Sequence, residues 1–101
     1  MITKEEFLKN VDKMPTQIFS GKQHKVYTDI KRVGNICTGK RESGLSFNID
    51  LDVLYRAYID NDKVNTNTLL DGGYITDRKR SPSIAIMMDA GLIDEEGYCN
   101  K

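Results

Sequence analysis

Apolar residues at the start of the chain recur at helical spacing. After the capping-box motif Thr3-Lys4-Glu5-Glu6, the apolar residues between positions 7 and 14 fall on one helical face. Pro15 then disfavours the helical conformation of the residue that precedes it. The pattern therefore predicts an amphipathic helix over residues 3–14.

The second half of the chain shows the helical period again. Asp50 can cap a helix over 51–60, in which apolar residues form a continuous stripe. A shorter helix is predicted within 64–70, capped by Asn65 or Thr66 and terminated by Gly72-Gly73.

The last predicted helix begins at Ser81-Pro82, because serine is a good cap residue and proline suits the first helical position. Residues 84–88 are all apolar, so this helix is expected to be buried, and Gly91 ends it.

Between these helical parts the period changes to that of strands. Three β-rich runs, at 25–33, 36–38 and 45–49, are separated by the turn signals Gly34-Asn35 and Ser43-Gly44. They predict a three-stranded antiparallel meander. The sequence leaves two alternatives open: a short extra strand near 17–19, and a helix in place of the first run.

The element order indicates an α+β fold: an N-terminal helix, a three-stranded antiparallel meander, and two to three helices packed on one face of the sheet. Residues 1–93 are expected to form a single domain, and residues 94–101 an acidic C-terminal tail. The residues expected to share the core are Phe7, Leu8, Val11, Phe47, Ile49, Leu51, Leu54, Ile59, Ile84 and Met88.

Composition and residue spacing indicate the location of the protein in the cell and the kinds of site that it can hold. No apolar run approaches the roughly 20 residues of a membrane span, and acidic residues stand where a signal peptide would be basic and apolar. We therefore expect a small soluble cytoplasmic protein without a membrane partner, in which Cys37 and Cys99 are free thiols. The two cysteines and His24 lack zinc-site spacing, so neither a metal nor a cofactor is expected.

Charge is balanced overall, with 15 basic and 15 acidic residues, but it is unevenly distributed. Residues 21–45 carry six Lys and Arg against two acids, and the candidate anion contacts in the meander are Lys31, Arg32, Lys40 and Arg41. A basic sheet is one way in which proteins bind nucleic acid. The alternative is that these cations protect a short edge strand from pairing with other chains.

A second basic group precedes the last predicted helix, in Arg78-Lys79-Arg80-Ser81. Cations are unfavourable at a helix N-terminus, yet an anion held there by backbone N–H groups would turn that penalty into attraction. The alternative is a solvated loop whose charges pair with nearby aspartates.

These features predict a small non-catalytic binding module for nucleic acid or another polyanion. The alternative is a protein–protein interaction or oligomerisation domain of a larger assembly, with a homo-oligomer or a protein as partner. An enzyme comes third, because no nucleophile and base are paired by the sequence. Whether the two basic groups share one face of the fold separates the first two hypotheses.

Overall fold

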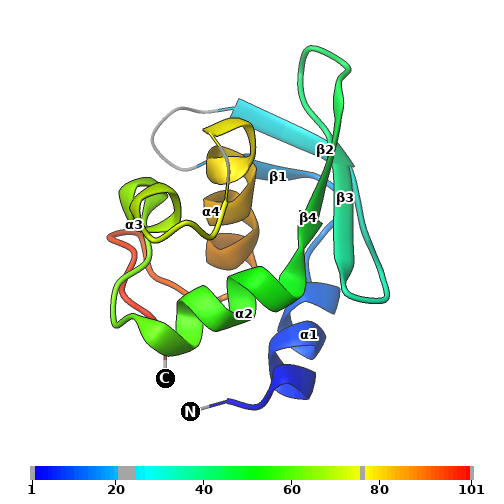
Figure 1. The fold of residues 1–101 in the computed structure, drawn as a ribbon. Helices are drawn as coiled ribbons and strands as arrows, with labels where there is room; N and C mark the ends of the chain where they lie inside the picture. The colour runs from blue at the N-terminus through cyan, green and yellow to red at the C-terminus, as the bar shows by residue number, and fades with distance from the viewer. Residues whose placement is uncertain (1, 21–24, 76, 101) are drawn as a thin grey trace.

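Helices cover one face of a four-stranded antiparallel sheet in the computed structural model, which describes residues 2–20, 25–75 and 77–100 (Figure 1). Among these residues no helix is long and apolar enough to cross a membrane. The elements, in chain order, are α1 (Lys4–Asp12), β1 (Ile18–Ser20), β2 (Lys25–Val33), β3 (Ile36–Lys40), β4 (Ser46–Asp50), α2 (Leu51–Asp60), α3 (Thr66–Asp71), a 3-10 turn η1 (Asp77–Lys79) and α4 (Arg80–Asp89).

The sheet has the order β1-β2-β3-β4, so the α+β class is confirmed and the strand count rises from three to four. The additional strand, β1, occupies the region near 17–19 that the sequence left open. It has only three residues, too few for alternation to identify it. Ile18 is fully buried opposite Tyr27, and α4 packs against the strand, so tertiary contacts stabilise it.

The meander follows its predicted turns. Gly34, with a φ of +60°, and Asn35 connect β2 and β3, and the flanking Val33 and Ile36 are cross-strand partners. The helix alternative for residues 25–33 is wrong, because this segment pairs with β1 at one end and with β3 at the other.

The caps predicted for α1 and α2 are confirmed. The Glu6 amide donates to the Thr3 hydroxyl at 3.2 Å, and the Thr3 amide donates to the Glu6 carboxylate at 3.5 Å, which completes the capping box of α1. The Asp50 carboxylate accepts from the Asp52 amide at 2.9 Å at the start of α2. For α3, Asn65 rather than Thr66 is the cap residue.

One hydrophobic core lies between the covered face of the sheet and the helices. Six of the ten predicted core residues are buried in it: Phe7, Val11, Phe47, Ile49, Leu51 and Leu54. The other four, Leu8, Ile59, Ile84 and Met88, are only partly buried and pack around its margin. In α4 the buried positions are Pro82, Ser83, Ala85, Ile86 and Met87, because the helix is covered on several sides, by β1, α3 and α1.

The acidic segment after residue 93 packs against the loop that joins α2 to α3. Tyr98 forms an antiparallel bridge with Lys63, and the Val64 amide donates to the Gly97 carbonyl at 2.8 Å. The Tyr58 hydroxyl donates to the Asn100 carbonyl. Residues 94–100 thus contact the body of the fold through backbone hydrogen bonds.

Candidate polyanion-binding face

The helices leave the second face of the meander uncovered, and alternation along the strands decides which side chains lie there. In β3 and β4 every second residue is buried, so Thr38, Lys40, Ser46 and Asn48 point away from the core. Lys31 of β2 joins them, because it is the direct cross-strand partner of Thr38. We call these five side chains the open face.

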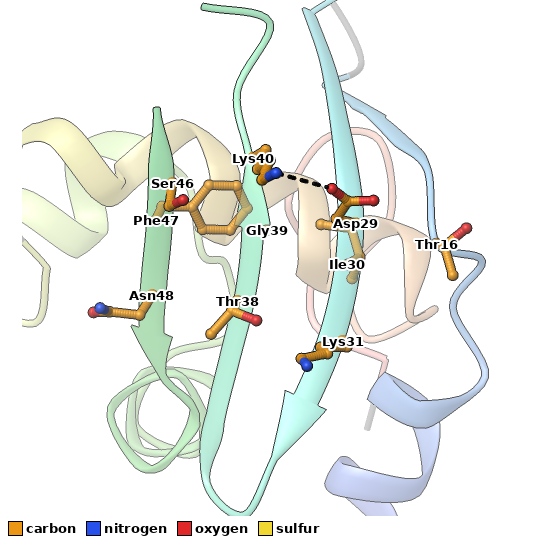
Figure 2. A pocket seen from close by; sticks show the side chains of 10 residues that line it. All are labelled: Thr16, Asp29, Ile30, Lys31, Thr38, Gly39, Lys40, Ser46, Phe47 and Asn48. Carbon is orange, nitrogen blue, oxygen red and sulfur yellow. Dashed lines mark ion pairs between the residues drawn. The ribbon is translucent and has the colours of Figure 1, made fainter. Parts of the chain in front are cut away.

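Register aligns three of them in one line across the sheet. Lys31 pairs with Thr38, and Thr38 pairs with Asn48, so a cation, a hydroxyl and an amide follow one another on adjacent strands. Figure 2 shows these three side chains at the same height on β2, β3 and β4. We call them the central row. Strands lie about 4.8 Å apart, so the row spans roughly 10 Å between the outer backbones.

A hollow of about 710 Å³ coincides with the open face. Its lining, drawn in Figure 2, consists of Thr16, Asp29, Ile30, Lys31, Thr38, Gly39, Lys40, Ser46, Phe47 and Asn48. Polar and charged side chains from three strands therefore surround one concave surface.

Gly39 allows two large side chains to meet beside the middle strand. A Cβ atom at this position would lie 2.6 Å from Cζ of Phe47 and 2.7 Å from Cδ1 of Ile30. Both distances are shorter than carbon atoms tolerate, so a larger residue here would force the Phe47 and Ile30 side chains to move. Phe47 also packs edge-on against Tyr27, with ring centroids 5.6 Å apart, which connects the lining of the hollow to the core.

A β-bulge shapes one side of the hollow. Thr28 pairs with Lys40 and Lys31 pairs with Thr38, so two residues of β2, Asp29 and Ile30, oppose the single Gly39. The Asp29 carboxylate lies 3.5 Å from Nζ of Lys40 on the open face (Figure 2).

The fold does not place all candidate cations of the meander on the same face of the sheet. Lys31 and Lys40 lie on the open face. Arg32 pairs with Cys37 in register and therefore faces the helices, where Nε and Nη2 donate to both carboxylate oxygens of Asp12 at 2.6 and 2.8 Å. Its Nη1 donates to the Gly34 carbonyl.

Arg32 therefore connects β2 to α1. The hydrogen bond between them lowers the pKa of Asp12 and raises the pKa of Arg32.

The second basic group does not form the predicted helix entrance. The helix α4 begins at Arg80, preceded directly by η1, and its cap residue Lys79 makes no capping hydrogen bond through its side chain. Ser81 is thus inside the first turn, and Pro82 stands at the third helical position. Proline is tolerated there because the first four helical amides have no partner within the helix.

Ser83, two residues after Ser81 in the same helix, is closed to an external anion. Ser83 is completely buried, and its hydroxyl donates to the Lys79 carbonyl at 2.6 Å. An external anion cannot reach this position.

The two basic groups nevertheless meet at β4. Nη2 of Arg41 donates to the Arg78 carbonyl, and Nζ of Lys79 donates to Oδ1 of Asn48 at 3.1 Å. Lys79 therefore extends the central row by one cation. Cζ of Arg41 lies 5.7 Å from the centroid of the Phe47 ring, beside the hollow.

Of the eight nominated residues, the fold thus gathers four around one surface: Lys31, Lys40, Arg41 and Lys79. The Arg78 carbonyl accepts a hydrogen bond from Arg41 of this group, whereas Arg32 binds Asp12. Sequence reasoning missed the neutral residues Thr38, Ser46 and Asn48. The alternation of 45–49 placed Ser46 and Asn48 on the outer side, but their partners depend on strand register.

The described ranges offer little support for metal binding or for nucleophilic catalysis. No group of three His, Cys, Asp or Glu side chains there is placed to hold a metal ion, and His24 lies outside those ranges. Cys37 and Cys99 are free thiols. Burial raises the pKa of Cys37 to about 11, which makes it a poor nucleophile.

Comparison with protein-family models, with curated proteins and with solved structures finds no match for this chain. Its function therefore has to be inferred from its own residues and geometry.

Proposed function

We propose that this protein is a small non-catalytic module that binds a polyanion, preferably nucleic acid, across the open face of the sheet. The observation that carries the proposal is the central row with its extension, in which Lys31 and Lys79 flank Thr38 and Asn48 on one line. Lysines supply charge to phosphates, and hydroxyl and amide side chains supply hydrogen bonds.

The same face indicates how such a ligand would be held. Phe47 is the aromatic residue of the hollow, and it is only 4% exposed, so a base cannot stack on it. Recognition would therefore depend on the phosphate backbone rather than on base stacking. Binding should be independent of sequence and strongly dependent on salt.

The test is a fluorescence anisotropy titration with single-stranded and duplex oligonucleotides over a sodium chloride series. The variant Lys31→Ala/Lys79→Ala should weaken binding at low salt. If each lysine neutralises one phosphate of a single strand, the slope of log K against log salt should flatten by about 1.4.

Lys9→Ala/Lys13→Ala is the matched control, because it removes the same charge from exposed positions at the end of α1. If the wild type fails to bind at low salt, or if the control weakens binding as much as the open-face variant, the proposal is wrong.

An enzymatic use of the hollow is less well supported. Lys40 and Ser46 are direct cross-strand partners, and a lysine beside a serine can serve as a base for it. Such a lysine has to lose its charge in an apolar site. The Lys40 side chain is instead 54% exposed, and its Nζ forms an ion pair with Asp29. We therefore rank an enzymatic function below the binding module.

A protein–protein interaction or oligomerisation function is the second candidate. Val33 and Ile36, at the tip of the β2–β3 hairpin, are 62% and 38% exposed and form an apolar cross-strand pair. Light scattering after size-exclusion chromatography tests self-association. A dimer that Val33→Ser dissociates would favour this function, whereas a monomer at all concentrations would exclude a homo-oligomer.

We also propose that the protein is located in the cytoplasm. This location predicts that Cys37 and Cys99 stay reduced in the cell.

A further inference from the structure

Asp29 combines an unusual backbone with an exposed charge. Its φ is +53°, and among the described residues it is the only non-glycine residue with a positive φ. In this left-handed region a Cβ atom is crowded, so glycine is the usual occupant and Asp and Asn are the best-tolerated alternatives. The chain therefore holds a carboxylate where glycine would be less strained.

The surroundings fix this conformation. The next residue, Ile30, is buried, and its amide donates to the Thr16 carbonyl at 2.9 Å. Gly39 provides the space for the Ile30 side chain opposite the bulge. With Ile30 anchored toward the core, the Asp29 carboxylate is directed to the open face, where 69% of the side chain is exposed (Figure 2).

Its partner there is one of the cations of the proposed binding surface. The 3.5 Å separation between Oδ2 of Asp29 and Nζ of Lys40 neutralises much of the attraction that Lys40 would exert on an incoming anion. A phosphate that approached Lys40 would also meet the Asp29 charge and be repelled. By contrast, Lys31 and Lys79 make no ion pair with a carboxylate among the contacts of the described residues.

We infer that Asp29 is a specificity-determining residue: an internal anion that competes with the ligand for Lys40. This inference rests on the proposed polyanion-binding function. A single small anion gains too little at Lys40 to displace a tethered carboxylate. A polymer that also contacts Lys31 and Lys79 binds without needing Lys40, so the face selects polyvalent anions over single ones.

The test compares Asp29→Asn with the wild type in the anisotropy assay. Asparagine tolerates the left-handed conformation, so the fold should be retained, which thermal unfolding checks. Freeing Lys40 should tighten binding of a single-stranded oligonucleotide by about two- to fivefold at low salt, the range expected for one exposed ion pair. The salt slope should steepen by about 0.7, one additional phosphate contact.

Asp71→Asn is the control for net charge, because Asp71 is exposed at the end of α3 and away from the hollow. A second arm uses Lys40→Ala. It should weaken wild-type binding less than Lys31→Ala does, and it should remove the gain in the Asp29→Asn background. Inorganic phosphate, tested as a competitor, should compete measurably better against Asp29→Asn than against the wild type.

Two failures are distinguishable. If the wild type binds but Asp29→Asn binds no tighter than Asp71→Asn, or if Lys40→Ala weakens the wild type as much as Lys31→Ala does, the competitor role is overturned and the polyanion proposal stands. If neither the wild type nor Asp29→Asn binds at low salt, both are overturned.

Discussion

Replacing Gly39 with alanine should overpack the wall of the hollow. The new methyl group would lie 2.6 Å from Phe47 and 2.7 Å from Ile30, about 1 Å closer than carbon atoms normally pack. Phe47 is also held by its contact with Tyr27, so the neighbours cannot move without disturbing the core. Overpacking of this kind typically costs 1–3 kcal/mol, and we expect about 2 kcal/mol for Gly39→Ala.

The assay is urea unfolding followed by circular dichroism, supported by thermal unfolding. A loss of about 2 kcal/mol should lower Tm by roughly 8–16 °C in a domain of this size. Ile30→Val removes the Cδ1 atom of one clash, so the double variant Gly39→Ala/Ile30→Val should lose less stability than the sum of the single variants. A Gly39→Ala protein within about 0.5 kcal/mol of the wild type, or strict additivity of the pair, would contradict this account of the wall.

Three further predictions concern the body of the fold. Leu54→Ala should cost about 2–5 kcal/mol in the free energy of unfolding, because Leu54 is completely buried; a loss below about 1 kcal/mol would show that the site is poorly packed. The pKa of Asp12 is lowered by Arg32, so the pair stabilises the fold above pH 3.8, the ordinary pKa of aspartate, and this contribution is lost as the pH falls through the lowered value. Asp12→Asn should therefore lower the free energy of unfolding at pH 7, and this free energy should then fall less steeply as the pH is lowered. If its decrease at acid pH is the same as in the wild type, the ion pair is not maintained in solution. Thiol titration of the unfolded, non-reduced protein should find both Cys37 and Cys99 reactive, whereas the native protein should protect the buried Cys37, and two unreactive thiols after unfolding would instead indicate a disulfide.

Local signals in the sequence were sufficient for α1 and α2. The capping box at Thr3 and the cap at Asp50 specify helix starts through contacts within three residues, so α1 and α2 can be predicted without knowledge of the fold. Elements that depend on distant contacts could not be placed in this way. The strand β1 is only three residues long, and the start of α4 moves to Arg80 because η1 leads directly into it.

The candidate site shows the same division. Clusters of Lys and Arg are visible in the sequence, but their partners are not. Arg32 and Lys31 are neighbours in the chain, yet alternation sends one to Asp12 and the other to the open face. The line from Lys31 to Asn48 depends on register across three strands, and its extension to Lys79 depends on how η1 packs against β4.

The bulge at Asp29 could not be predicted from the sequence, because it too depends on distant contacts. An aspartate within a β-rich run gives no sign of a positive φ, which arises because Ile30 is anchored to the core and to Thr16. The residue that we propose to control anion selectivity is therefore identifiable only from the fold.

Binding across the open face can be mapped most directly by NMR. We predict that a single-stranded oligonucleotide, titrated at low salt into the ¹⁵N-labelled protein, shifts the amide resonances of Lys31, Thr38, Asn48 and Lys79 together, with a common affinity. The amides of α1, on the covered side of the sheet, should remain unchanged. If the shifts are absent, or if they occur in α1 rather than in the central row, the open face is not the binding surface of this protein.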